Sequence, residues 1–247
     1  FLPGDKAILI PRTSDTRVLF AIPWLGRTLV GTTDTAIKEI SYEPKPQDDE
    51  VDFILDTIGK YLKTRPTRQD VLSVFAGIRP LADSRKTLSR ATSAISRDHS
   101  IDIDDAGLLS IVGGKWTTYR LMAEDCVNEA ARLGGLPPSS CRTETMPIHR
   151  WEKQDDDIES ASSVRIHPNL PYLQSEIIRA VRHEMCRTVD DALARRTRSL
   201  ILDAKAASEC APMIAALIAH ELGRDHFWVE EQVSSFRRIA RQYVLNN

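Results

Sequence analysis

The sequence lacks both a long hydrophobic run and an excess of charge of one sign. Its longest apolar stretch, Cys210–Ala219, has ten residues even when Pro212 is counted, whereas a membrane-spanning helix needs about 20. Lys and Arg total 33, Asp and Glu total 35, and the formal net charge at pH 7 is -2. Proteins that hold a nucleic-acid backbone usually carry clustered Lys and Arg, so we expect no nucleic-acid partner.

Glycine and cysteine are also sparse. The 247 residues include 11 Gly, 13 Pro and 42% hydrophobic residues, a composition typical of a globular protein of one or two domains. The four cysteines (126, 141, 186 and 210) have no zinc-ligand spacing, so we expect reduced thiols and no metal site. The motif Gly-x-Gly-x-x-Gly is absent, and the first residue is Phe rather than Met, which indicates a piece of a longer protein.

Hydrophobic periodicity predicts an α+β part at the start of the chain. Apolar runs predict strands at residues 7–11, 18–23, 28–31, 71–78, 95–103 and 108–112. Spacings of three and four predict helices over 51–62 and 115–133. The run 18–22 does not alternate, which predicts a strand buried on both faces. We expect one α+β domain over residues 1–135.

The remainder of the chain is predicted to be helical. Residues 136–170 are rich in Pro, Ser and Asp and are interpreted as a linker or long excursion. Apolar periodicity predicts helices over 175–185, 188–197, 206–222 and 227–245, and Thr188-x-x-Asp191 predicts a capping box. We expect a C-terminal helical domain over residues 171–247.

The most informative motif is the stretch Gly113–Arg120, which reads Gly-Gly-Lys-Trp-Thr-Thr-Tyr-Arg and joins a predicted strand directly to a predicted helix. Paired glycines allow a sharp turn and a close ligand approach. The amides of residues 115–117 would lie at a positive helix end beside a lysine and two hydroxyls, which favours bound negative charge. The alternative is a tight turn with a surface lysine.

Two arginines are further candidates. Arg79 precedes Pro80 at the end of an apolar run, and its guanidinium suits a bidentate grip on phosphate or carboxylate. The alternative is a structural ion pair. Arg97 lies beside His99, for which a non-catalytic role is favoured. A basic cluster at 195–198 has acids nearby, which predicts a salt-bridged helix face.

Several stretches together carry a family resemblance: Phe20–Trp24, Val30–Asp34, Phe75–Leu81, Ile95–His99, Val112–Arg120 and Glu184–Arg196. In this order they resemble the C-terminal half of the FAD-dependent, quinone-linked glycerol-3-phosphate dehydrogenases. The resemblance implies part of a substrate-binding sheet, the last strand and helix of an FAD domain, and an all-helical domain.

The same resemblance implies an activity and site residues. The reaction would be oxidation of sn-glycerol 3-phosphate to dihydroxyacetone phosphate, with hydride passing from C2 to flavin N5 and electrons to quinone. Arg79 would hold the substrate phosphate, Arg97 the phosphate or the C2 oxygen, and Lys115 would face both flavin and substrate. Arg97 and Lys115 are thus the catalytic candidates. Residues at the FAD would be Gly113, Gly114, Lys115, Trp116, Thr117 and Thr118.

The resemblance also bears on partners and location. It implies a cytoplasmic enzyme in peripheral contact with the inner face of the cytoplasmic membrane, and it leaves a homodimer open. Since the family's FAD-phosphate fingerprint lies upstream of Phe1, we expect the chain alone to be inactive. Two alternatives stay open: a glycerol-phosphate oxidase that passes electrons to oxygen, and a folded module without catalysis.

Overall fold

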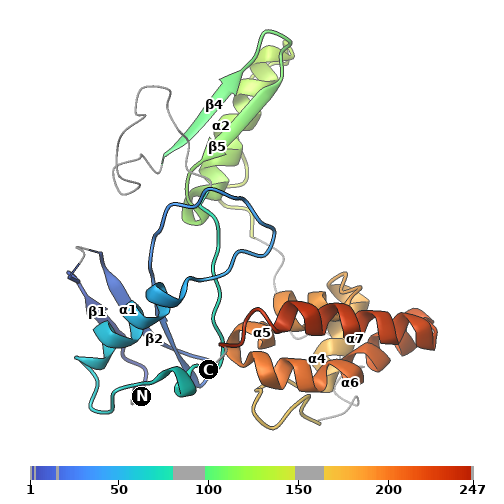
Figure 1. Ribbon diagram of the computed structural model, residues 1–247. Helices are drawn as coiled ribbons and strands as arrows, with labels where there is room; N and C mark the ends of the chain where they lie inside the picture. Colours follow the sequence, from blue (N-terminus) through green and yellow to red (C-terminus); the bar gives the residue numbers. More distant parts are fainter. Residues whose placement is uncertain (1, 3, 15–16, 80–97, 148–163, 246–247) are drawn as a thin grey trace. The chain divides into compact units, whose positions relative to one another are not determined.

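The computed structural model describes residues 2, 4–14, 17–79, 98–147 and 164–245 (Figure 1). The chain divides into two compact units. The first comprises residues 1–33, 39–77 and 154–247, and the second comprises residues 34–38 and 78–153. Strands and helices are mixed in the N-terminal part and helices alone fill the C-terminal part, which confirms the predicted fold class.

The first unit begins with an antiparallel sheet in the order β1-β2-β3, formed by Ile8–Ile10, Leu19–Trp24 and Arg27–Gly31. Leu25 and Gly26 both have positive φ, as in the tight turns that join twisted hairpins. Leu19 and Ala21 are fully buried, whereas Phe20 is 42% exposed. The prediction that this strand is buried on both faces was therefore wrong, because its side chains alternate between a covered and an open face.

Helix α1, Asp48–Gly59, supplies the cover for that sheet. Its Ile58 packs in one cluster with Ile10, Leu19 and Ala21. Three acids fill its first turn, and the amide of Gln47 donates to Glu50 at 3.0 Å, so the positive helix end is both capped and neutralised.

The strand predicted over residues 71–78 is absent from the structure. The segment is irregular, and its backbone bonds to the helical part of the same unit instead of to a strand. The Val74 amide donates to the Tyr243 carbonyl at 2.9 Å, and the Leu72 carbonyl accepts from the Ala204 amide at 3.2 Å. An apolar run predicts burial, but a strand also needs a neighbouring strand as hydrogen-bond partner.

The helical part of the first unit has one hydrophobic core. Its elements are α4 (Gln174–His183), the π-helical turn η4 (Asp191–Arg196), α5 (Ser199–Leu202), α6 (Ala204–Leu222) and α7 (His226–Ala240). Leu193, Ile214, Ile218 and Phe236 are buried at its centre, and Leu170 joins them from the segment before α4. Helices α6 and α7 lie side by side.

Side-chain caps fix where these helices begin. The predicted capping box is confirmed: the Asp191 amide donates to Thr188 Oγ1 at 3.0 Å, and the Thr188 amide donates to Asp191 Oδ2 at 3.1 Å. Asp203 and Asp225 cap α6 and α7 with single hydrogen bonds, which they accept from the amides of Ala206 and Trp228 respectively.

The described residues of the second unit form a β-hairpin with one helix beside it. Strands β4 (His99–Ile103) and β5 (Leu109–Gly113) pair antiparallel, and a 3₁₀ turn, η3 (Trp116–Thr118), leads into helix α2 (Tyr119–Leu133) (Figure 1). After α2 the chain has a helix stop signal, since Gly135 has φ +65° and two prolines follow.

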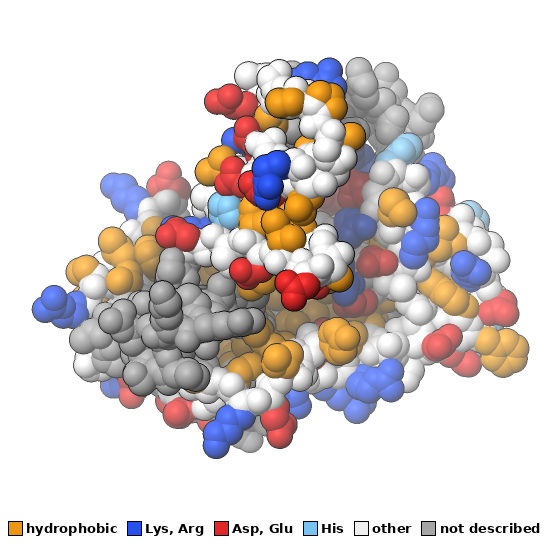
Figure 2. Space-filling view, turned by 90° about the horizontal axis from the view of Figure 1, so that it is seen from above, with side chains coloured by type: hydrophobic (Ala, Val, Ile, Leu, Met, Phe, Trp, Pro, Cys, Tyr) orange, Lys and Arg blue, Asp and Glu red, His pale blue; other side chains and the backbone are white. Residues whose placement is uncertain are grey.

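Charge is mixed over the surface. On the face shown in Figure 2, Lys and Arg side chains are interspersed with Asp and Glu. Among the described helices, none combines the length and the apolar character needed to cross a bilayer. The described residues also contain no group of His, Cys, Asp and Glu suited to a metal ion.

Candidate functional site

The candidate site is built on a glycine turn at the end of β5. Gly113 and Gly114 both have φ +81°, a left-handed conformation that side-chain-bearing residues rarely adopt. A Cβ atom on Gly114 would also lie 2.3 Å from Met122 Sδ of α2. The sequence therefore needs glycine here to turn the chain from the strand into the helix.

Backbone donors follow the turn. The Thr118 amide and Thr118 Oγ1 both donate to the Lys115 carbonyl, at 3.0 and 3.1 Å, and so close the first turn. Within the described part of the chain, the amides of Lys115, Trp116 and Thr117 donate to no protein acceptor. Three free N–H groups at a helix start form a site for an anion or a carbonyl oxygen.

The side chains of this motif are open to solvent. Lys115 and Thr117 are exposed, and among the described residues Lys115 has no carboxylate partner. Trp116 is 86% exposed and stacks on Tyr119, with ring centroids 5.5 Å apart. An ammonium group and an aromatic face thus stand beside the free amides.

Arg79 belongs to the same unit and is held by an acid. Its Nη1 lies 2.7 Å from Asp34 Oδ2, and the two side chains are 42% and 25% exposed. The ion pair that the sequence offered as an alternative is present, yet only one nitrogen of the guanidinium takes part in it. The substrate-binding role of Arg79 stays a prediction, and Arg97 lies outside the described residues.

His99 and Asp125 form a second pair near the turn. His99 Nε2 lies 3.0 Å from Asp125 Oδ2, which joins β4 to α2. The sequence favoured a non-catalytic role for His99 and did not single out Asp125. The sequence does not mark Asp125, because it is one of several acids on α2 and only the fold brings it to His99.

Elsewhere, the structure explains the basic cluster of the helical part. Arg195 pairs with Asp190 and with Asp191, which confirms the predicted salt-bridged face. Arg196 donates to the Glu184 carbonyl at 2.6 Å.

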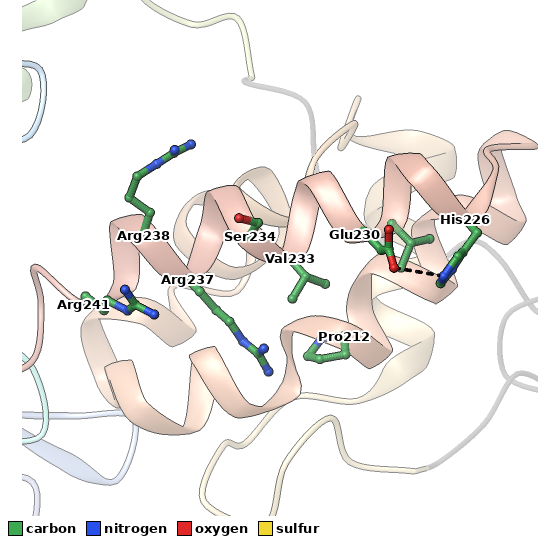
Figure 3. Close-up of a pocket in the computed structure, with 9 residues that line it drawn as sticks. Pro212, His226, Glu230, Val233, Ser234, Arg237, Arg238 and Arg241 are labelled. Carbon is green, nitrogen blue, oxygen red and sulfur yellow. Dashed lines mark ion pairs between the residues drawn. The ribbon is translucent and has the colours of Figure 1, made fainter.

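A groove of about 700 Å³ lies in the helical part, between α6 and α7 (Figure 3). Pro212 and Val233 form apolar lining, and Arg237, Arg238 and Arg241 line one end. Two of these arginines belong to the last turn of α7, where the negative end of the helix dipole stabilises cations. None of the residues predicted for the site lines this groove.

Two profiles of known protein families match the sequence of this chain. A family profile described as FAD dependent oxidoreductase matches residues 2–120. A second profile, the C-terminal domain of alpha-glycerophosphate oxidase, matches residues 143–229. By sequence the chain therefore belongs with the FAD-dependent oxidoreductases.

Individual relatives narrow this class. The mitochondrial glycerol-3-phosphate dehydrogenase SDP6 of Arabidopsis thaliana is 32% identical over 99% of this chain and 46% of its own length. The mitochondrial glycerol-3-phosphate dehydrogenase of Homo sapiens is 33% identical over 97% of this chain and 38% of its own length. The chain belongs to the glycerol-3-phosphate dehydrogenase family, and it spans less than half the length of these two relatives.

A solved structure agrees on the fold. The glycerol-3-phosphate dehydrogenase from Bacillus halodurans, complexed with FAD, matches 97% of this chain and 54% of its own chain, with a TM-score of 0.71 and 24% sequence identity.

Proposed function

We propose that this chain is the C-terminal half of an FAD-dependent enzyme that oxidises sn-glycerol 3-phosphate to dihydroxyacetone phosphate. An enzyme named glycerol-3-phosphate dehydrogenase aligns with 99% of this chain at 32% identity, and this match supports the reaction. The observation that carries the proposal is the turn at Gly113 and Gly114, which presents three amides without an acceptor among the described residues, beside the Lys115 ammonium. The intact protein is called the full-length enzyme below.

The residues of the turn fit one edge of a flavin. Its pyrimidine ring carries carbonyl oxygens that accept hydrogen bonds, and the amides of Lys115, Trp116 and Thr117 are donors without a protein acceptor among the described residues. When bound, FAD supplies the hydride acceptor at N5, with electrons then passing to quinone. The fixed N–H groups and the Lys115 ammonium would stabilise negative charge at this edge.

Arginines and the same lysine would bind and orient the substrate. Arg79 offers a guanidinium of which Asp34 occupies one nitrogen, so its remaining N–H groups can bind the substrate phosphate. Asp34 limits the directions in which that guanidinium can point. Arg97 would hold the phosphate or the C2 oxygen, and Lys115 would face both the flavin and the substrate.

A second candidate acceptor is oxygen. The profile that matches residues 143–229 is named after an oxidase, so a glycerol-phosphate oxidase is the competing function. The chemistry at the substrate is the same in both cases, and only the oxidant that receives the electrons differs.

Anaerobic reduction tests the proposal. Glycerol 3-phosphate added to the full-length enzyme should bleach its flavin absorbance, whereas glycerol at the same concentration should not. Subsequent reoxidation by a soluble quinone analogue without hydrogen peroxide supports the dehydrogenase, and rapid peroxide release in air supports the oxidase. A flavin that glycerol 3-phosphate fails to bleach would contradict both functions.

The proposal extends to location and assembly. We propose a cytoplasmic enzyme bound peripherally to the inner face of the membrane, where a lipid-soluble quinone is accessible, and we include a homodimer as its assembly. Release from membranes by high salt without detergent, followed by a mass measurement in solution, tests both points. Retention that only detergent reverses would contradict peripheral binding.

A further inference from the structure

Helix α2 carries the candidate flavin-binding turn at its start, yet none of its 15 residues is fully buried. A helix without a packed core face is poorly restrained in rotation and tilt by apolar contacts alone, because such contacts have no preferred direction. A directional contact between α2 and the hairpin would supply that restraint.

His99 is placed to provide that contact. It lies opposite Gly113 in the register of β4 and β5. A Cβ atom built on Gly114 would lie 3.3 Å from His99 Cβ. The histidine thus sits directly against both glycines of the turn, and its side chain is only 21% exposed.

Asp125 completes the contact from the helix side. Its carboxylate can only accept, so His99 Nε2 carries the proton and donates across the 3.0 Å separation. Met122 of α2 also lies at the turn, but its thioether adapts to its surroundings and specifies little. The His99–Asp125 hydrogen bond is therefore a directional link between β4 and the helix that begins at the turn.

We propose that His99 and Asp125 are positioning residues for the FAD site. By fixing α2 against β4, they set the direction in which the amides of residues 115–117 point at the flavin edge. Catalytic and binding groups need such support, since a small misalignment of donors weakens their hold on developing charge. This inference rests on the proposed function and assigns the pair no contact with FAD or substrate.

Four single variants of the full-length enzyme test it. His99→Leu and Asp125→Ala remove the hydrogen bond. His99→Gln keeps an N–H donor at the reach of Nε2. Glu124→Gln is the matched control, because it breaks the Arg120–Glu124 ion pair of the same helix without touching the turn. The readouts are the dissociation constant for FAD, the midpoint potential of the bound flavin and the melting temperature.

We expect His99→Leu and Asp125→Ala to weaken FAD binding roughly tenfold, because misaligned amides hold the flavin edge less well. Both should lower the midpoint potential, because misdirected donors stabilise the reduced, more negative flavin less. His99→Gln and Glu124→Gln should stay within about twofold of wild type.

Two results would overturn the inference. One is that both removal variants bind FAD with wild-type affinity and potential, whatever their melting temperatures. The other is that neither removal variant folds, since the pair would then be a general stabilising contact. A wild-type full-length enzyme that binds no FAD would contradict the proposed function itself, and the two failures are therefore distinguishable.

Discussion

Arg79 Nη1 lies 2.7 Å from Asp34 Oδ2, although 45 positions of sequence separate the two residues. Both residues belong to the second compact unit, and both come from stretches that carry the family resemblance. A guanidinium has five N–H donors, and this contact uses one nitrogen. The arginine is therefore oriented by protein and still able to bind an anion.

The Arg79→Lys variant of the full-length enzyme tests this role. A fixed guanidinium meets a phosphate with two parallel donors, whereas lysine offers a flexible point charge. Because binding of the phosphate also orients C2, KM should rise and kcat should fall. The decrease in kcat/KM should correspond to a loss of roughly 2 to 4 kcal/mol of transition-state stabilisation. Steady-state kinetics on glycerol 3-phosphate measures the loss.

Glycerol is the control substrate, since it lacks the phosphate and should be equally poor for wild type and variant. Asp34→Asn is the companion variant, which removes the charge that orients Arg79 and should have a smaller effect of the same kind. If Arg79→Lys lowered the melting temperature and left the preference for glycerol 3-phosphate over glycerol unchanged, Arg79 would be a structural residue only.

The sequence predicted those elements whose stability is local. A sequence shows directly which residues lie three or four positions apart. The capping box of Thr188 and Asp191 and the apolar spacing that predicted α2 both depend on such residues. The prediction of a strand over residues 71–78 was wrong because the hydrogen-bond partners of that backbone, such as Ala204, lie more than 100 positions away in the sequence. The short helix α5 was also missed, since four residues carry too little periodicity to detect.

The candidate site divides in the same way. The glycine turn was predicted because adjacent glycines before a helix have a direct backbone meaning, and both have positive φ. The partners of Arg79 and His99 were not predicted. Asp34 and Asp125 are ordinary acids in the sequence, and only the folded chain brings each within 3.0 Å of its partner.

Gly114→Ala should damage the turn in two ways. Alanine at φ +81° costs about 1 to 2 kcal/mol of stability, and its Cβ would also displace Met122 and with it the start of α2. We therefore expect a lower melting temperature together with weaker FAD binding in the full-length enzyme. Thermal unfolding and flavin titration measure the two effects.

Gly107→Ala is the matched control for that variant. Gly107 has φ +83° in the turn between β4 and β5, and a Cβ there would meet nothing within 4 Å. It should cost similar stability and leave FAD affinity unchanged. Equal loss of FAD affinity in both variants would show that strain in the hairpin, rather than contact with Met122, is responsible.

Two of the four thiols should be unreactive in the folded chain. Burial raises the pKa of Cys186 to about 11 and that of Cys210 to about 12, so neither forms the reactive thiolate at pH 8. Cys141 is exposed and should react with a disulfide reagent first, and Cys126 should react more slowly. Colorimetric thiol counting before and after denaturation measures this, and Cys141→Ser should remove the fast phase.

The same shifts predict a loss of stability in alkali. An unfolded thiol ionises near pH 8.5, and the folded thiols ionise only at higher pH. Their contribution is therefore complete below pH 8.5 and decreases as pH rises toward 11. Four thiols reacting at equal rates in the native chain at pH 8 would contradict the burial of Cys186 and Cys210.

The 247-residue chain purified alone should be colourless. Tight binding of FAD needs a glycine-rich turn for the pyrophosphate, and this sequence contains no Gly-x-Gly-x-x-Gly. The turn at Gly113 and Gly114 offers donors to one edge of the ring only, and Lys115 there is exposed to water, which weakens each hydrogen bond it could form. An absorbance spectrum of the purified chain and a titration with free FAD measure the affinity, with the full-length enzyme as the positive control. Stoichiometric FAD on the isolated chain would show that the ring site alone holds the cofactor, and would place most of the binding energy at this turn.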